Sequence, residues 1–194
     1  MVCSSTQGRF CAGADLHEIR NRGIQEALRL RAQAVFDALD SCTKPTIAAI
    51  DGPAIGGGLE LTLACDLRLA STDARFALPE TGLGILPAAG ALYRLPRVVG
   101  DAMARKLILF GEELTAEEAM VCGLVSEVVS PDELPHRVDQ WAAAAAMRDP
   151  LALRLAKEAL TLIRSEEGAR SFSACAQALL YPGSRRGRGG RRES

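Results

Sequence analysis

Residues 44–68 read KPTIAAIDGPAIGGGLELTLACDLR. Lys44-Pro45 ends a helix, and the short apolar run over residues 46–50 predicts a buried strand. The loop that follows carries Gly56-Gly57-Gly58, and the apolar segment 59–65 can continue as a helix, although it is too short for its periodicity to decide. Glycines permit a tight turn, and the first N–H groups of a helix lack internal partners, so this turn can bind an oxyanion. The alternative, which the glycines alone favour, is a connector that packs a helix tightly on a sheet.

Two glutamates near this loop stand in apolar surroundings. Glu60 is the only charged residue between Asp51 and Asp66, and Glu80 follows the run Phe-Ala-Leu-Pro. Desolvation raises the pKa of a carboxyl towards values useful in acid and base catalysis, and two carboxyls in different environments can divide these roles. The alternative for Glu60 is a first-turn residue that points to water. Carboxylates twenty residues apart in sequence need not meet.

A third segment that could contribute to catalysis is the small-residue turn RFCAGAD at residues 9–15. It leads into a helix with Asp15 near its start, so it too can expose a backbone N–H. Taken alone, the segment is by default interpreted as an ordinary strand-to-helix turn.

The rest of the chain alternates predicted strands and helices. Apolar spacing and turn residues predict strands at 66–70, 75–78 and 125–129, and helices at 24–41, 88–99, 101–110, 115–122, 130–147 and 150–164. Thr115 and Glu118 form a capping-box pattern at the start of one of these helices, and Gly123 follows its end. This order indicates an α/β fold with a helical C-terminal third.

Length and composition exclude several classes of protein. The chain has 194 residues, 48% of them hydrophobic and 24% charged, so it can bury a core and is neither disordered nor collagen-like. The formal net charge is −1, but residues 183–194 hold five Arg and one Glu, a local +4 that leaves −5 for residues 1–182. We expect this basic tail to be disordered. It has no aromatic residues to stack on bases, so nucleic acid is not an expected partner.

The cysteines and the first residues bear on the compartment. Six cysteines without paired spacing, with His17 and His136 as the only histidines, predict neither a disulfide framework nor a metal site. Free cysteines suit a reducing compartment, the first residues lack signal-peptide features, and no apolar run reaches the length of a membrane span. We therefore expect a cytoplasmic protein without a membrane partner. The mitochondrial matrix is the alternative if a longer eukaryotic precursor exists.

Together, the three chemical segments and the motifs around them resemble the enoyl-CoA hydratase/isomerase family, also called the crotonase superfamily. The matching stretches are Phe10-Cys-Ala-Gly-Ala-Asp-Leu16, Lys44-Pro-Thr-Ile-Ala-Ala-Ile-Asp-Gly52, Gly56-Gly-Gly-Leu-Glu60, Ala64-Cys-Asp-Leu-Arg68, Phe76-Ala-Leu-Pro-Glu80, Gly82-Leu-Gly-Ile-Leu-Pro87, Arg94-Leu-Pro and Ala119-Met-Val-Cys-Gly-Leu-Val125. The resemblance covers roughly residues 9–165. It implies a ββα spiral core with a helical C-terminal segment, an acyl-CoA substrate, no cofactor beyond the coenzyme A of that substrate, and a homotrimer or hexamer.

The resemblance also implies roles for individual residues. The backbone N–H groups of Ala14 and Gly57 would form the oxyanion hole for the thioester oxygen. Glu60 and Glu80 would hold one water between them, deliver its hydroxyl to the β-carbon and give a proton to the α-carbon. The substrate-binding residues would be Ala12, Asp15, His17, Gly56, Pro79, Leu86 and Ala88.

The family resemblance also implies domain boundaries. We expect a core at residues 1–130, a helical oligomerisation segment at 131–182 and the basic tail at 183–194. Because the chain opens within a strand, at Val2 to Ser5, we expect the first strands and helix of the family core to be missing.

The two glutamates favour hydration of a 2-enoyl-CoA, in fatty-acid or amino-acid degradation, over other reactions of the family. One alternative is isomerisation or another enolate chemistry, since Ala88 occupies a position where the family usually has glycine. The other is not an enzyme but a truncated family member that acts as a partner subunit or an RNA binder.

Overall fold

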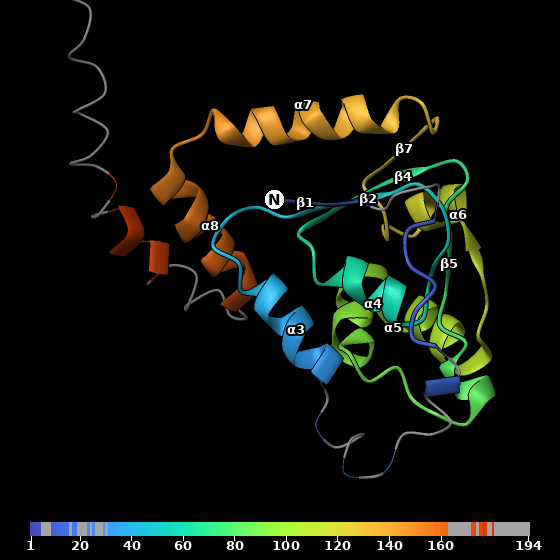
Figure 1. Ribbon diagram of the computed structural model, residues 1–194. Coiled ribbons are helices and arrows are strands. Elements are labelled where there is room, and N and C mark those ends of the chain that lie inside the picture. Colours follow the sequence, from blue (N-terminus) through green and yellow to red (C-terminus); the bar gives the residue numbers. More distant parts are fainter. Residues whose placement is uncertain are drawn as a thin grey trace, which may run out of the picture. The chain divides into compact units, whose positions relative to one another are not determined.

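The computed structural model describes residues 1–4, 9–15, 17–18, 23, 25, 29, 31–162, 172–173, 175–177 and 180 (Figure 1). The chain divides into two compact units. The first comprises residues 1–42 and 46–143, and the second comprises residues 43–45 and 144–194. The basic tail and the expected end of the last helix at residue 164 lie outside the described residues.

A parallel four-stranded sheet lies in the first unit. Its strands are β1 (Val2–Ser4), β2 (Ile47–Ile50), β4 (Leu67–Ser71) and β7 (Glu127–Val129), in that spatial order. The register pairs Val2 with Ile47, Ile47 with Leu67, and Leu69 with Glu127. All residues of β2 are buried, which explains why its sequence is continuously apolar rather than alternating.

A second, smaller sheet consists of β3 (Ala54–Ile55), β5 (Arg75–Ala77) and β6 (Leu114–Thr115). Strand β3 pairs with β5 in parallel, and β5 pairs with β6 in the antiparallel direction. We expected a loop throughout residues 51–58, and this was wrong for β3. A strand of two residues is too short to produce a sequence period, so its pairing with β5 decides its conformation.

The described helical elements are α3 (Arg31–Asp40), α4 (Gly57–Leu63), the short 3-10 helix η1 (Glu80–Leu83), α5 (Ala91–Phe110), α6 (Ala116–Val121), α7 (Leu134–Ala146) and α8 (Pro150–Leu162). The glycine turn therefore does continue as a helix. The predicted helices 88–99 and 101–110 form one element, α5, which is kinked at Gly100 with φ 78°. The capping box at the start of α6 is confirmed, because Thr115 Oγ1 accepts from the N–H of Glu118 and the Glu118 carboxylate accepts from the N–H of Thr115.

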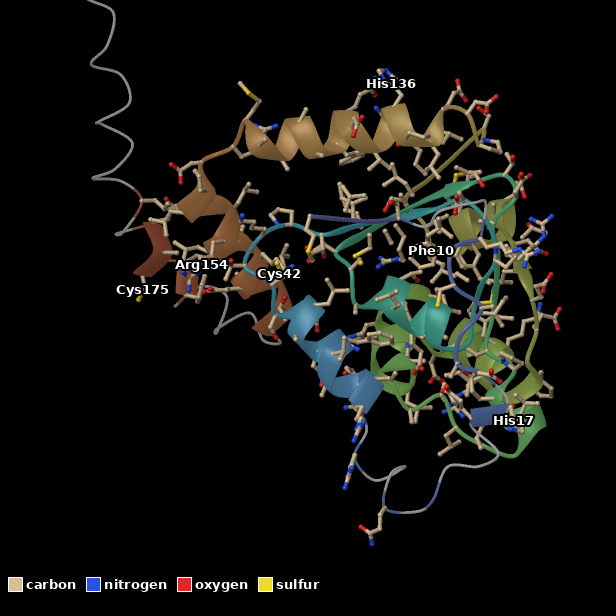
Figure 2. The ribbon with its side chains drawn as sticks, in the orientation of Figure 1. Phe10, His17, Cys42, His136, Arg154 and Cys175 are labelled. Atoms are coloured by element: carbon tan, nitrogen blue, oxygen red, sulfur yellow. The ribbon has the colours of Figure 1, made fainter. Side chains whose placement is uncertain are left out.

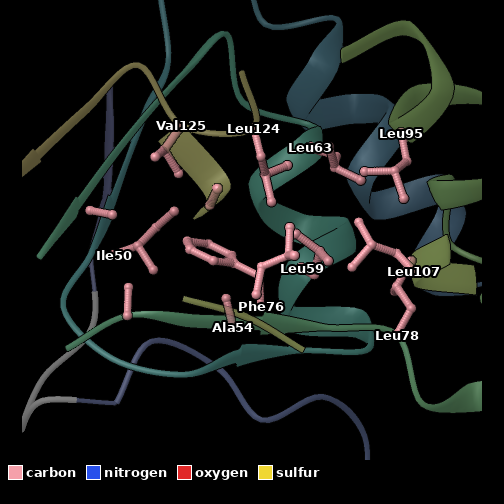
Figure 3. Packing of buried hydrophobic residues seen from close by; sticks show 14 of the residues in the cluster. Ile50, Ala54, Leu59, Leu63, Phe76, Leu78, Leu95, Leu107, Leu124 and Val125 are labelled. Carbon is pink, nitrogen blue, oxygen red and sulfur yellow. The ribbon is translucent and has the colours of Figure 1, made fainter. Parts of the chain in front are cut away.

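The main core lies where the two sheets, α4 and α5 meet, as Figure 3 shows. Phe76, Ile50 and Leu59 are fully buried, as is Leu107 from α5. Each such side chain stabilises the fold by about 1.5–3 kcal/mol. A second cluster joins Leu134 and Val138 of α7 to strands β2 and β4.

In the second unit, α8 begins at Pro150, as predicted, and carries an ion pair between Arg154 and Glu158 at 2.8 Å (Figure 2). Among the described residues, every helix is too short or too polar to cross a bilayer. The same residues contain no cluster of side chains suited to a metal ion.

Substitution of Gly58 tests how closely α4 packs against the backbone of Cys11. A Cβ at this position would lie 2.8 Å from the carbonyl carbon of Cys11, so we expect Gly58→Ala to lower the free energy of unfolding by about 2 kcal/mol or more. Gly57→Ala is the matched control, because among the described residues its Cβ would meet the Cα of Gly13 alone, at 3.8 Å. Urea denaturation followed by circular dichroism measures both. Equal stability of the two variants would contradict this packing.

Candidate active site

Residues 9–15 join the glycine turn through the backbone of Cys11. The N–H of Cys11 donates to the carbonyl of Pro53 at 3.1 Å, and the N–H of Ile55 donates to the carbonyl of Cys11 at 3.0 Å. Cys11 thus pairs with Ala54 as an isolated parallel bridge beside β3. Two segments that are remote in sequence are held side by side by this bridge.

Gly13 brings the first segment directly against the start of α4. Its φ is +84°, and a Cβ there would lie 2.9 Å from the carbonyl oxygen of Ile55 and 3.3 Å from the backbone nitrogen of Gly57. Ala14 follows immediately, so the backbones of the two expected oxyanion-hole residues are neighbours. Gly57 is the first residue of α4, and its N–H therefore has no partner within the helix.

Gly56 brings Glu80 to the same turn. Its backbone adopts φ 55° and ψ −123°, which favours glycine, and its N–H donates to the carbonyl of Ala77 at 2.8 Å. A Cβ on Gly56 would lie 2.6 Å from Oε1 of Glu80. The carboxylate therefore packs on the bare Cα of the glycine.

Glu60 is buried, with a relative exposure of 3%. Its Oε1 accepts two backbone hydrogen bonds, from the N–H of Ala89 at 2.8 Å and from the N–H of Ala91 at 3.0 Å. Burial raises the pKa of the Glu60 carboxyl, while the hydrogen bonds from residues 89–91 and the positive charge of Arg94 act in the opposite direction. The charged form of Glu60 is thus supported by groups from α5 and the turn before it.

Glu80 is buried to a similar extent but has fewer partners. Within the described residues, its Oε2 atom is inaccessible to solvent and has no hydrogen-bond partner. Burial raises the pKa of the Glu80 carboxyl, and the negative charge of Glu60 raises it further, whereas its own backbone N–H lowers it. Both glutamates meet the same glycine, since Glu80 Oε1 packs against Gly56 and the N–H of Glu60 donates to the carbonyl of Gly56 at 3.0 Å.

The expected substrate-binding residues lie in several places in the first unit. Ala12, Asp15 and His17 are exposed, and the N–H of His17 donates to Oδ1 of Asp15 at 2.7 Å (Figure 2). Leu86 and Ala88 are also exposed, and Pro79 is half-buried at the start of η1. The methyl group of Ala88 is therefore not part of the protein core.

Sequence reasoning missed the side chains behind Glu60. Arg94 is buried, and its guanidinium bonds to Asp37 and Asp40 of α3 and to the carbonyl of Ala89. One feature of the sequence could have pointed to this arginine: Gly90 precedes Arg94 by about one helical turn. The structure shows why a glycine stands there, because a Cβ on Gly90 would lie 3.1 Å from the central guanidinium carbon of Arg94.

Comparison with known proteins shows which family the chain resembles. The family model described as Enoyl-CoA hydratase/isomerase matches residues 1–188. Crotonyl-CoA hydratase from Syntrophomonas wolfei is 42% identical over 161 residues, which cover 82% of this chain and 62% of that protein. Short-chain-enoyl-CoA hydratase from Clostridium acetobutylicum is 41% identical over 153 residues, covering 78% of this chain and 59% of that protein. The chain spans about three fifths of the length of these curated relatives.

Solved structures lead to the same class. The crystal structure of enoyl-CoA hydratase from Bacillus anthracis superposes with a TM-score of 0.86 at 36% identity, covering 91% of this chain and 70% of that one. The architecture is thus the crotonase-like α/β fold that the sequence motifs predicted. The chain belongs to the enoyl-CoA hydratase/isomerase family.

The burial of Glu80 has a measurable effect on stability. Because the pKa of Glu80 is higher in the folded than in the unfolded chain, its ionisation destabilises the fold as pH rises through this interval. We expect Glu80→Gln to raise Tm relative to the unsubstituted protein, and by more at about pH 8 than at about pH 5. Thermal unfolding at both pH values measures this. Glu113→Gln, at an exposed position, is the control; an equal effect of the two substitutions would contradict the assignment.

Proposed function

We propose that this chain is an enoyl-CoA hydratase, a hydro-lyase that adds water across the 2,3 double bond of a 2-enoyl-CoA thioester. The observation that carries the proposal is the pair of buried carboxylates, Glu60 and Glu80, beside the glycine turn. The names of the two relatives, crotonyl-CoA hydratase and short-chain-enoyl-CoA hydratase, support the same reaction.

The surroundings of the two carboxyls suggest which acts as base and which as acid. Glu60 accepts two backbone hydrogen bonds and is near a guanidinium, and both features favour its carboxylate form. Glu80 has an unpartnered oxygen and experiences the charge of Glu60, which favours its protonated form. Glu60 is therefore the general base and Glu80 the general acid.

In the proposed reaction, Glu60 removes a proton from water as the hydroxyl bonds to the β-carbon. The electrons of the double bond move towards the thioester oxygen and form an enolate. The N–H groups of Ala14 and Gly57 stabilise this negative charge, since donors fixed in advance act most strongly where charge develops. Glu80 then gives its proton to the α-carbon, and the thioester carbonyl is restored.

The substrate supplies the only cofactor-like group, its coenzyme A. Ala12, Asp15 and His17, which are exposed, would bind the substrate together with Gly56 and Pro79. Leu86 and Ala88 would contact the acyl chain. Residues 131–182 would mediate assembly into a homotrimer or hexamer, and the protein would act in the cytoplasm, with the mitochondrial matrix as the alternative compartment.

Isomerisation is the second candidate, because an enoyl-CoA isomerase/hydratase from Mycosarcoma maydis is 39% identical over 183 residues. A panel of 2-enoyl-CoA and 3-enoyl-CoA thioesters distinguishes the two reactions. A hydratase removes the absorbance of the conjugated enoyl thioester when it is given a 2-enoyl-CoA. An isomerase produces this absorbance when it is given a 3-enoyl-CoA.

Substitution of the two glutamates tests the chemistry. We expect Glu60→Gln and Glu80→Gln each to lower kcat for hydration of crotonyl-CoA by about a hundredfold or more, because each removes one proton-transfer group. The assay follows the loss of enoyl thioester absorbance, with the exposed Glu113→Gln as control. Full activity in both active-site variants would refute the mechanism.

The pH dependence of kcat provides a further test. Activity falls at low pH as Glu60 becomes protonated, and at high pH as Glu80 loses its proton, so we expect a bell-shaped profile. Because burial raises the pKa of both groups, both limbs should lie above the ordinary glutamate value of about 4.3. The two limbs report the coupled pair. A profile that is flat through this region would contradict the assignment.

A further inference from the structure

The backbone turn that holds Glu60 is itself held from behind by Arg94. Ala89 donates its N–H to Glu60 Oε1 at 2.8 Å, and its carbonyl accepts a hydrogen bond from Arg94 Nη1 at 3.2 Å. Ala89 thus connects the Glu60 carboxylate, through its N–H, to the Arg94 guanidinium, through its carbonyl. Gly90, at φ 123°, leaves the space that the guanidinium fills.

The other end of the guanidinium is anchored on α3. Arg94 Nη2 donates to Asp37 Oδ1 at 2.6 Å and to Asp40 Oδ2 at 3.3 Å. The hydroxyl of Tyr93 donates to the same Asp37 oxygen at 2.7 Å, and its ring lies 4.8 Å from the guanidinium carbon. The Arg94 side chain is only 7% exposed, whereas Asp37 and Asp40 are half-exposed, so the guanidinium is held at the boundary between the core and solvent.

We propose that Arg94 is a positioning residue for the general base: clamped by Asp37 and Asp40, it orients the turn at residues 89–91 so that two N–H groups point at Glu60 and hold it as a carboxylate. This inference rests on the proposed hydratase function for its effect on catalysis. Its effect on Glu60 itself follows from geometry and holds for any reaction of this site.

The charges around Glu60 give the direction of the effect. Arg94 approaches from α5, Glu80 from η1, and Asp37 and Asp40 from α3 lie behind Arg94. When the Arg94 guanidinium is removed, the charged side chains that remain of those just named are the carboxylates of Glu80, Asp37 and Asp40. The Glu60 carboxylate is then less stable, and Glu60 takes up a proton at higher pH.

Substitution of Arg94 separates charge from geometry. We expect Arg94→Gln to lower kcat for crotonyl-CoA hydration by about tenfold or more with little change in KM, and to move the acid limb of the pH profile upward. Arg94→Lys keeps the charge but cannot reproduce the planar fork that holds the turn, so kcat should fall and the acid limb should move upward by less than in Arg94→Gln.

Arg68→Gln is the matched control for a merely structural effect. Arg68 is also buried and donates to three backbone carbonyls, those of Leu124, Thr62 and Cys65. We expect this variant to lose stability without a shift of the acid limb. If Arg94→Gln folds poorly, Asp37→Asn removes an anchor from a half-exposed position and should lower kcat with the fold retained.

A carbon-detected NMR titration of the Glu60 carboxyl tests the inference independently of activity. An upward shift of the Glu60 midpoint in Arg94→Gln, absent in Arg68→Gln, supports the positioning role even if the chain hydrates no enoyl-CoA. An unchanged midpoint overturns the inference, and so does an unchanged kcat in an active enzyme. Failure of the proposed function is recognised separately, by the absence of hydration in the unsubstituted protein.

Discussion

The close approach of Cys11 to Gly58 is the constraint on which the site depends. The Cys11 backbone occupies the space in which a side chain at position 58 would lie, so residues 9–15 can pack directly on the first turn of α4. This contact brings Gly13 against Gly57 and sets Ala14 beside it. Glu60 follows Gly58 by two residues in the same helix, and its side chain is buried. A single backbone contact thus places residues 9–15 beside the start of the helix that carries one of the two carboxyls.

The second physical theme is the cost of two buried carboxyls. Both side chains are largely removed from water, and the negative charge of Glu60 disfavours the ionised form of Glu80. The fold offsets this cost unequally. Glu60 receives backbone donors and a counter-charge, whereas Glu80 packs Oε1 against Gly56 and keeps Oε2 without a hydrogen-bond partner among the described residues. Such an unequal environment lowers stability in a way that acid–base chemistry can use.

Much of the fold could be predicted from local patterns. Strands β2, β4 and β5 are contiguous apolar or turn-bounded runs, and the capping box of α6 is a signature four residues long. The break between residues 88–99 and 101–110 could also be predicted, since Gly100 has non-helical dihedral angles and kinks α5 there. Strand β3 could not be predicted, because its conformation depends on its partner β5. Arg94 was missed for a related reason: a charged residue in a helix pattern is expected to be solvated, and its burial depends on two aspartates of α3.

The sequence by itself determined the family, the order of strands and helices, and the two glutamates as candidates for catalysis, because these follow from residue types at fixed local spacings. The tertiary structure alone decided that Glu60 and Glu80 are close, which of them receives hydrogen bonds and a positive neighbour, and which residue holds that neighbour in place. The physical reason is that proton affinity depends on distances in space and on exclusion of water. These distances join residues 37, 60, 80 and 94, whose proximity no local pattern encodes.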